Sequence, residues 1–419
     1  MAGQVKHAAT VTLGKMLQGK DSGSDTRAPY MRAANVQPDG VLALDDVNEM
    51  WFGEGELEQL SIRAGDVVVV EGGQGGFGRA AYIDQDIPGW GFQNSINRLR
   101  PLGDFDGRFI AFYLIALRAS GFIRACSNVV SMPHLTAEKL ARIPIPLPPA
   151  EVQRAIADYL DRETARIDTL IEEQQQLIKM LRERRFALRV NVALHGTTPT
   201  EETESPLPWA KTLPAAWRVV PLTSVAALES GHTPSRSRED WWQDCYIPWV
   251  SLHDVGVMRG VKYLNDTTQH ISDAGIANSS ARLLPARTVV LSRDATVGRT
   301  AIMGVPMATS QHFAAWVCGP DLDPEYLWVL FEDAMQPFFD SFQNGSTIRT
   351  IGMRDLKAFR IPLPPLDEQR RIVEFLDEET AKIDSLITET ERFVELSRER
   401  RSALITAAVT GQIDVREGA

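Results

Sequence analysis

Several short stretches of the sequence combine residue types that could carry out chemistry. The glycine-rich stretch from Gly72 to Gly78 follows a run of four valines, Val67 to Val70. Such a loop after a strand can bring backbone N–H groups close to a phosphate. This loop lacks the Gly-Lys-Ser/Thr ending of a nucleoside-triphosphate site, and no long helix is expected directly after it. We therefore do not expect a nucleotide site here.

Two further stretches imitate catalytic motifs. Asp323-Pro324-Glu325-Tyr326 is close to the Asp-Pro-Pro-Tyr tetrad with which amino-methyltransferases bind a flipped adenine, but it lacks the second proline. Pro324 is better explained as the first residue of a helix. Asp66 and Glu71 flank the valine run as nuclease carboxylates could, but Gly73 stands where a nuclease would have lysine. Neither stretch supports an active site.

The histidines and cysteines do not form the patterns of a metal site or a disulfide framework. The seven histidines contain no His-Glu-x-x-His pair, and Cys126, Cys245 and Cys318 lie far apart. The longest apolar run, Phe109 to Leu117, is about half the length that a membrane span requires. We expect a soluble, cytoplasmic protein with no catalytic residue, metal or cofactor of its own.

The charge of the chain is unevenly distributed. The formal net charge is −11, which counts against nucleic-acid binding when it is taken globally. Acidic residues are concentrated between Asp39 and Glu58, whereas a glycine-containing stretch such as Arg293 to Arg299 is basic or neutral. Net charge therefore lowers the expectation of DNA binding without deciding it.

One stretch that could position such residues occurs twice. Ile-Pro-Leu-Pro-Pro at 145–149 and again at 361–365 is followed each time by a long polar segment with spaced apolar residues. The second copy lies 216 residues after the first, so that Gln153 matches Gln369 and Arg185 matches Arg401. Prolines hold the chain extended, and the acidic residues that follow favour a helix N-terminus. Both segments are therefore predicted to be long helices.

The apolar residues of these segments step by threes and fours, or by sums of them, as in a coiled-coil seam. In the first segment they are Ile156, Leu160, Ile167, Leu170, Leu177, Leu181 and Leu188; in the second they are Ile372, Leu376, Ile383, Leu386, Phe393 and Leu404. Each helix should be about 65 Å long. The second helix can bury its seam only by running back along the first, which predicts an antiparallel pair with a pseudo-twofold axis.

The regions before the two helices repeat one another in their order of elements. In both, a buried strand (Val67 to Val70; Val289 to Leu291) precedes a loop that ends in Gly-Arg, and Tyr30 to Val36 is expected to be a further strand. The fold class is α+β, with two β-rich α/β domains joined by two long helices. We divide the chain into a first domain (1–144), first helix (145–196), linker (197–208), second domain (209–359), second helix (360–411) and tail (412–419).

The run from Ile361 to Ile372, the Glu-Thr-Ala-x-Ile-Asp sequence of both helices and their Arg-Glu-Arg-Arg endings resemble the specificity subunit of type I restriction–modification systems. Ala295 to Gly298 and the segment at Gln311 are similar to that family's second domain. The resemblance covers essentially the whole chain. It implies that each domain is a target-recognition domain that reads one half of a bipartite site in double-stranded DNA. The helices would fix the unread gap and bind two methyltransferase subunits.

The resemblance also implies which partners hold the chemistry. The methyltransferase subunits would modify adenines with S-adenosylmethionine, and motor-nuclease (restriction) subunits would add cleavage that depends on ATP and Mg²⁺. This chain would be the non-catalytic subunit, with no cofactor of its own.

Reading a DNA sequence requires side-chain donors and acceptors at the edges of the bases. The DNA-binding candidates are Arg79, Gln93, Asn94 and Arg98 in the first domain, and Arg293, Thr296, Arg299, Gln311, His312 and Arg349 in the second. The candidates for partner binding are apolar residues expected on the outer faces of the helices: Tyr159, Ile171, Ile178, Phe375, Ile387 and Val394.

Two other functions remain open at this point. The helix pair could belong to a scaffold protein that dimerises without binding DNA, or the chain could be an intact methyltransferase or nuclease. Affinity purification separates these hypotheses, because methyltransferase and motor-nuclease subunits would co-purify only with a specificity subunit, whereas a scaffold would purify as a lone homodimer.

Overall fold

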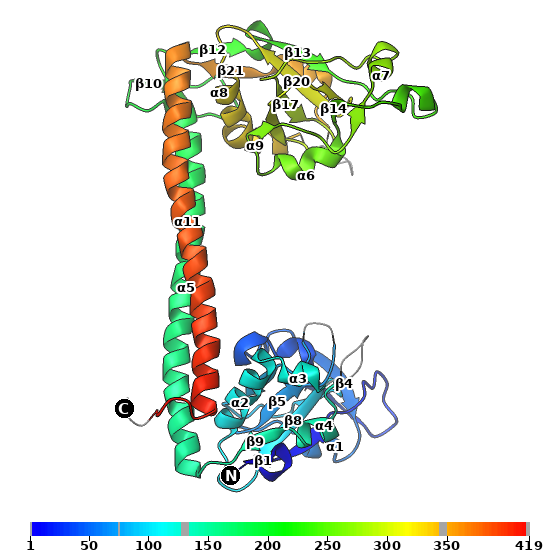
Figure 1. Ribbon diagram of the computed structural model, residues 1–419, viewed down its shortest axis with the longest axis vertical. Helices are drawn as coiled ribbons and strands as arrows, with labels where there is room; N and C mark the ends of the chain where they lie inside the picture. Colours follow the sequence, from blue (N-terminus) through cyan, green and yellow to red (C-terminus); the bar gives the residue numbers. More distant parts are fainter. Residues whose placement is uncertain (1, 74–75, 127–133, 343–349, 416–419) are drawn as a thin grey trace. The chain divides into compact units, whose positions relative to one another are not determined.

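The computed structural model describes residues 2–73, 76–126, 134–342 and 350–415 of the chain. The chain divides into two compact units, Met1–Gln176 with Glu391–Ala419, and Leu177–Thr390. Each unit consists of one β-rich domain and part of each of two long helices (Figure 1). The expected α+β architecture with an internal repeat is therefore confirmed.

The two long helices begin where the repeated prolines end. Helix α5 comprises Ala150–His195 and α11 comprises Leu366–Val409. Each is preceded by a short strand that contains the first prolines, β9 (Pro144–Pro146) or β21 (Arg360–Leu363). Among the residues that the structure describes, no helix is long and apolar enough to cross a membrane.

The first domain contains a four-stranded antiparallel sheet and a three-stranded mixed sheet, besides the antiparallel pair of β1 with β9. Its four-stranded sheet has the order β2-β8-β5-β6, and the four valines of β5 are completely buried. A three-stranded sheet has the order β4-β3-β7, and helix α2 (Gly107–Ala119) contacts β5 and β6. The strands are β1 (Ala2–Gln4), β2 (Ala9–Leu13), β3 (Thr26–Met31), β4 (Asn48–Phe52), β5 (Val67–Val70), β6 (Ala80–Tyr82), β7 (Gly91–Phe92) and β8 (Ile96–Pro101), and the short helices are α1 (Glu56–Gln59), α3 (Phe122–Ala125) and α4 (Ala137–Ala141).

The second domain repeats both sheets. The order β13-β20-β17-β18 matches β2-β8-β5-β6 and is extended by β15, and the order β16-β14-β19 matches β4-β3-β7. The strands are β10 (Glu202–Glu204), β11 (Thr212–Pro214), β12 (Arg218–Pro221), β13 (Ala226–Ser230), β14 (Ile247–Val250), β15 (Tyr263–Leu264), β16 (His270–Ile271), β17 (Val289–Ser292), β18 (Thr300–Met303), β19 (Ala308–Thr309) and β20 (Phe313–Cys318). The helices are α6 (Val255–Met258), α7 (Asp273–Ala277), α8 (Pro324–Val329), α9 (Gln336–Asp340) and α10 (Met353–Ala358), with a π-helical turn at Leu330–Ala334.

The predicted strand from Tyr30 to Val36 is placed too late in the chain. Strand β3 comprises Thr26–Met31, and Ala33–Asn35 form a 3₁₀ turn. The turn forms because the backbone N–H of Arg32 donates to the side-chain oxygen of Asn35 at 2.9 Å, which offers the chain an alternative to the strand ladder.

A buried glutamine at the start of each long helix holds the helix to its own domain. The side-chain oxygen of Gln153 accepts from the backbone N–H of Asp106 at 3.1 Å, and that of Gln369 accepts from Asp323 at 2.8 Å. Asp106 and Asp323 are the N-cap residues of α2 and α8, and Pro324 is the first residue of α8, as predicted. The repeated glutamine therefore fixes the start of a long helix against the start of a helix of the adjoining domain: α5 against α2 in the first unit, and α11 against α8 in the second.

Within each unit the two long helices are antiparallel. In the first unit, Ile156 and Leu160 of α5 lie in one apolar cluster with Ile405 of α11. In the second unit, Val192 of α5 lies in one cluster with Leu376 of α11. The beginning of each helix thus packs against the end of the other.

In the middle of the helices the buried residues recur at steps of four and three, with one step of seven from Ile171 to Ile178 across the half-buried Gln174. In α5 they are Leu160, Thr164, Ile167, Ile171, Ile178 and Leu181; in α11 they are Leu376, Thr380, Ile383, Ile387, Thr390, Val394 and Ser397. The predicted seam is wrong at four positions in the middle of the helices, because Leu170, Leu177, Leu386 and Phe393 are between 37% and 50% exposed. The observed seam follows a heptad pattern in which Gln174 is half-buried.

The physical reason for this error is that threonine occupies seam positions. Thr164 and Thr380 are buried, and each hydroxyl donates to the carbonyl oxygen four residues earlier, at 2.7 and 2.6 Å. A hydroxyl satisfied by its own helix adds no unpaired polar group to the seam. The prediction followed apolar residues alone, so it moved the seam by one residue onto Leu170 and Leu386.

Candidate nucleic-acid interface

In each domain a glycine allows two loops to cross at very short distance. A Cβ atom on Gly231 would lie 1.7 Å from the carbonyl oxygen of Thr309, and one on Gly14 would lie 2.2 Å from that of Gln93. No other residue fits at either position. The crossing brings the segment after β13, or after β2, against the loop that contains the predicted base-reading residues.

In the second domain this crossing assembles a chain of four polar side chains. The hydroxyl of Thr233 donates to Oε1 of Gln311 at 2.6 Å, and Nε2 of Gln311 lies 3.3 Å from Nε2 of His312. Nδ1 of His312 lies 2.9 Å from a carboxylate oxygen of Asp294. Gln311 is the most exposed of the four side chains, whereas the side chain of Asp294 is only 20% exposed. Such an arrangement presents an oriented amide to a ligand.

The other predicted residues of the second domain have different surroundings. Arg293 donates from its backbone N–H to His312 and from Nε to the carbonyl oxygen of Ile351 at 3.1 Å, so it ties the cluster to a neighbouring segment. Thr296 is exposed in the loop after β17. Arg299 is half-buried and near Glu332. Arg349 lies outside the described residues.

Glu332 and Asp333 form an acidic pair in the π-helical turn. The pKa of Glu332 is raised to about 7, first by burial and then by the charge of the neighbouring Asp333, while the charges of Arg189, Arg299 and Arg185 oppose that rise. Asp333 itself accepts from the buried Arg189 of α5 at 2.7 Å. These contacts connect α5 to the second domain.

The predicted residues of the first domain are only partly assembled. Gln93 and Asn94 lie together in the loop between β7 and β8, half-exposed. Arg79 donates to the carbonyl oxygen of Val36 at 3.4 Å and lies near Arg118, whose pKa is lowered by burial and then by the charge of Arg79.

Arg98 has a structural role in this conformation. It is 6% exposed, and one of its guanidinium nitrogens donates to the carbonyl oxygens of Gln59 and Ser61 at 3.0 and 2.6 Å. Its guanidinium group also lies 5.4 Å from the ring centre of Phe92, and burial lowers its pKa. Because its side chain is buried and both terminal nitrogens donate within the fold, Arg98 is not available to a base edge in this conformation.

A loop rich in arginine and tryptophan lies beside the Gln311 cluster and was missed by the sequence analysis. Arg236 stacks over Trp242 and Trp249, with its guanidinium carbon 4.0 and 5.6 Å from the ring centres. Arg238 lies 4.9 Å from the ring centre of Trp241. The signal was available in the two arginines and two tryptophans within the eight residues from Ser235 to Trp242, because basic side chains close to aromatic ones are typical of nucleic-acid binding.

The expected partner-binding residues are mostly not on the outer faces of the helices. Ile171, Ile178, Ile387 and Val394 are buried in the seam at 9% exposure or less, so their predicted placement is wrong. Phe375 is exposed and Tyr159 is half-buried. The physical reason is the one-residue shift of the seam described above.

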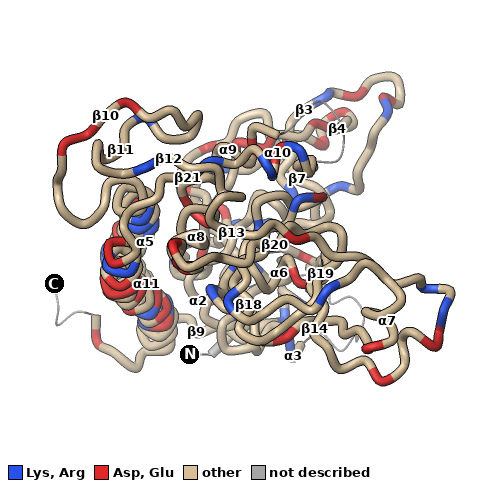
Figure 2. Tube along the Cα trace, turned by 90° about the horizontal axis from the view of Figure 1, so that it is seen from above, with Lys and Arg blue, Asp and Glu red and all other residues tan. Residues whose placement is uncertain are grey.

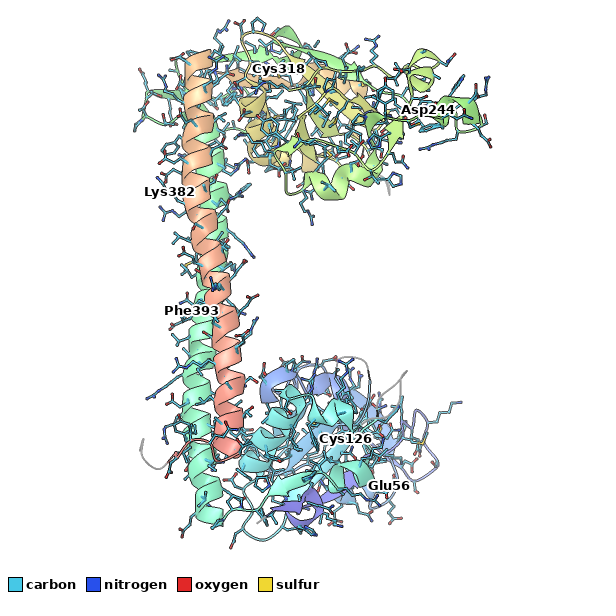
Figure 3. All side chains as sticks on the ribbon, viewed as in Figure 1. Glu56, Cys126, Asp244, Cys318, Lys382 and Phe393 are labelled. Carbon is cyan, nitrogen blue, oxygen red and sulfur yellow. The ribbon has the colours of Figure 1, made fainter. Side chains whose placement is uncertain are left out.

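Other apolar residues are exposed on the helices instead. Leu170, Leu177 and Met180 of α5 match Leu386, Phe393 and Leu396 of α11 at the same separation of 216 residues, and all six are at least 37% exposed. Phe393 projects from α11 in Figure 3. Acidic and basic residues are interspersed along both long helices (Figure 2). Among the described residues, no group of three or more His, Cys, Asp or Glu side chains is arranged to hold a metal ion.

Comparisons with known proteins agree with this arrangement. A family model described as the type I restriction modification DNA specificity domain matches residues 10–180 and again residues 214–392. The chain is 27% identical over 165 residues to the type I restriction enzyme MjaIX specificity subunit of Methanocaldococcus jannaschii, a stretch that covers 39% of this chain and 38% of that protein. It is 25% identical over 185 residues to the EcoR124I/EcoR124II specificity subunit of Escherichia coli, covering 43% of this chain and 45% of the relative.

These alignments span less than half the length of the curated relatives concerned. A solved structure from a type I restriction–modification system has a TM-score of 0.74, with 20% identity, over 98% of this chain and 97% of the other. That likeness concerns the fold over the entire chain.

Proposed function

Because the chain belongs to the family of type I restriction–modification DNA specificity subunits, we propose that each of its domains reads one half of a bipartite DNA site. The two long helices would fix the unread gap between the half-sites. In this proposal the chain contributes recognition and assembly, and its partners contribute the reactions.

The observation that carries the proposal is the internal repeat with different residues at matched places. Both domains have the same sheets and the same glycine crossing, but Gln311 and His312 of the second domain stand where the first has Asn94 and Ser95. Asp294, which pairs with His312, is matched by Gly72. One fold with two sets of donors and acceptors is suited to reading two different short sequences.

The DNA-contacting residues follow from their surroundings. We propose Arg79, Gln93 and Asn94 in the first domain, and Arg293, Thr296, Arg299, Gln311 and His312 in the second, with Arg349 retained from the sequence and Arg98 omitted. The loop with Arg236 and Arg238 is added, because guanidinium groups held over tryptophan faces suit contact with phosphates or bases.

The exposed apolar residues of the helices are proposed to bind two methyltransferase subunits. An exposed leucine or phenylalanine at the same position of each repeat offers the same surface twice, as two copies of one partner require. The three residues of α5 and the three of α11 that match them replace the buried isoleucines and valine in this role.

The chemistry in this proposal belongs to the partners. The methyltransferase subunits would transfer a methyl group from S-adenosylmethionine to adenine, and motor-nuclease subunits would cleave DNA with ATP and Mg²⁺. Residues of this chain would bind DNA, set the separation of the half-sites and hold the assembly together.

Mapping of methylated adenines in genomic DNA tests the proposal. DNA from the host strain should carry methylation at one bipartite sequence, and an isogenic strain without this chain should lose methylation at that sequence only. Affinity purification of the full chain should also recover methyltransferase subunits. Purification as a lone homodimer together with an unchanged methylation map would favour the scaffold hypothesis.

A further inference from the structure

We propose that Gln311 reads an adenine in the half-site of the second domain, with Asp294, His312 and Thr233 as positioning residues. This inference rests on the proposed function and assigns a base to one residue of it. It follows from the direction of each hydrogen bond in the chain of four side chains.

The first step concerns the imidazole of His312. An ionised carboxylate only accepts hydrogen bonds, so Asp294 requires a proton on Nδ1 of His312, which lies 2.9 Å from its oxygen. In the neutral imidazole Nε2 is then an acceptor. Asp294 thereby fixes which ring nitrogen faces Gln311.

The second step fixes the amide of Gln311. Its Nε2 lies 3.3 Å from Nε2 of His312 and must donate to it, and its Oε1 accepts from the hydroxyl of Thr233 at 2.6 Å. His312 selects this orientation of the amide, and the hydroxyl of Thr233, which can donate or accept, supports it by donating to the oxygen. One N–H and one oxygen lone pair of Gln311 remain without a partner in this network, and the side chain is exposed.

The third step matches this pair of groups to a base. In the major groove adenine presents an acceptor, N7, beside a donor, the N6 amino group, and the amide of glutamine can bind both. Guanine presents two acceptors, N7 and O6, so one of them would face the amide oxygen. A glutamine that its neighbours hold in one orientation therefore selects adenine over guanine more strictly than a freely rotating one.

The first domain lacks the positioning residues. Gly72 stands at the place of Asp294, Ser95 at that of His312 and the exposed Met16 at that of Thr233. Asn94 is therefore a matched control within the chain, with an amide at the same place and without the same partners.

The test measures base discrimination by the complete complex purified through a tag on this chain. The probes are duplexes that contain the methylated bipartite site of the wild-type complex, with one base pair of the second domain's half-site replaced at a time. The readout is kcat/KM for methyl transfer to each duplex. Replacement of one particular A·T pair by G·C should lower kcat/KM of the wild type about 10- to 100-fold.

The variant Gln311→Ala should reduce that ratio to near unity at this base pair and leave the ratios at the other base pairs unchanged. Gln311→Arg should move the preference to guanine, because a guanidinium group matches N7 and O6. Asn94→Ala should leave this position as strict as in the wild type. Full discrimination by Gln311→Ala at every adenine would overturn the inference, as would a loss confined to a base other than adenine.

The positioning residues are tested by conservative pairs. Thr233→Val, which removes the hydroxyl at nearly constant shape, should weaken the adenine preference, and Thr233→Ser should preserve it. Asp294→Asn can donate to Nδ1 of His312, which turns Nε2 into a donor and should weaken the preference as well. Equal adenine preference in Thr233→Val and the wild type would refute the positioning role. A wild-type complex that methylates no bipartite site would count against the proposed function and not against this inference.

Discussion

Arg401 of α11 donates from Nε and Nη2 to the two carboxylate oxygens of Asp168 on α5, at 2.8 and 3.1 Å. The same pair occurs in the second unit, where Nε of Arg185 lies 2.8 Å from Asp384. These four residues are the last arginine of each Arg-Glu-Arg-Arg ending and the aspartate of each Ile-Asp sequence. The sequence motifs that reveal the repeat therefore supply the residues of the ion pairs that connect the two helices within each unit.

Removal of the Arg401 side chain should destabilise the first unit. The guanidinium group is 8% exposed and bidentate, whereas Asp168 is 44% exposed and remains hydrated after the change. We expect Arg401→Ala to lower the free energy of unfolding by about 1–3 kcal/mol. Thermal unfolding followed by circular dichroism measures this, with the exposed Arg398→Ala as control. Equal melting temperatures for the two variants would contradict the structural role of the ion pair.

Loss of the glutamine anchor should have a larger effect at Gln369 than at Gln153. Nε2 of Gln369 donates to the carbonyl oxygens of Asp321 and Pro364, both at 2.9 Å, whereas Nε2 of Gln153 donates to Pro148 alone. Each buried backbone group left without a partner costs about 1–3 kcal/mol. Comparison of the melting temperatures of Gln369→Ala and Gln153→Ala checks the order, and a smaller loss for Gln369→Ala would be inconsistent with it.

The sequence was sufficient to predict elements whose signals are local. The prolines at 145–149 and 361–365 mark the starts of α5 and α11, and the valines at 67–70 mark a buried strand. The seam register was not predictable from apolar spacing, because Thr164 is made acceptable in the seam by a hydrogen bond to its own helix.

The arrangement of the candidate site depended on contacts between distant residues. Thr233 and Gln311 are 78 positions apart, and they meet because Gly231 permits a close approach to Thr309. Arg98 was predicted to read a base, but its guanidinium group donates to the backbone carbonyl oxygens of Gln59 and Ser61. Partners on the backbone leave no pattern of side chains in the sequence, so this role of Arg98 was not predictable.

The carboxyl group of Glu332 should make stability depend on pH. Its pKa is raised to about 7, chiefly by burial, above the value of 4.5 for an unperturbed glutamate. Between these two values the unfolded chain releases the proton while the folded chain retains it, so the contribution of Glu332 to stability falls as pH rises and is constant above about pH 8. Glu332→Gln should remove this loss, with a gain of about 1–3 kcal/mol at pH 8 and little change at pH 4.5.

The melting temperatures of the wild type and Glu332→Gln are measured between pH 4.5 and 8, and their difference is taken at each pH. The contributions of all other titrating groups cancel in this difference, because both proteins contain them. The exposed Glu374→Gln serves as control and should follow the wild type at every pH. A difference between Glu332→Gln and the wild type that does not grow as the pH rises would show that this carboxyl is not protonated in the folded chain.

Exchange of residues 209–359 for the same region of a relative should change one half of the methylated sequence and leave the other half intact. Each domain has its own sheets and its own base-reading candidates, so the half-sites should be read independently. Mapping of methylated adenines in a strain that carries the exchanged chain provides the measurement. A change in both halves, or in neither, would refute the assignment of one half-site to each domain.

The last prediction concerns the gap between the half-sites. Four residues inserted near Gln174 alone should abolish assembly, because they displace the heptad seam of α5 against α11. Matched insertions near Gln174 and Thr390 lengthen both helices by about 6 Å and turn them about 40° beyond a full turn. One base pair of B-DNA rises about 3.4 Å and turns about 34° in the same right-handed sense. The doubly lengthened protein should therefore methylate sites whose gap is wider by one or two base pairs, with both half-sites unchanged.

Matched insertions of seven residues are the informative control. They preserve the heptad pattern and add about 10.5 Å, close to the rise of three base pairs, but they turn the helices about 20° short of two full turns. Three base pairs turn the DNA by about 103°, so the second half-site would face away from its domain. Seven residues should thus permit folding, with an unchanged melting profile, and prevent methylation, whereas four residues should permit both. A functional four-residue variant that still methylates the original gap would show that the helices do not set the spacing.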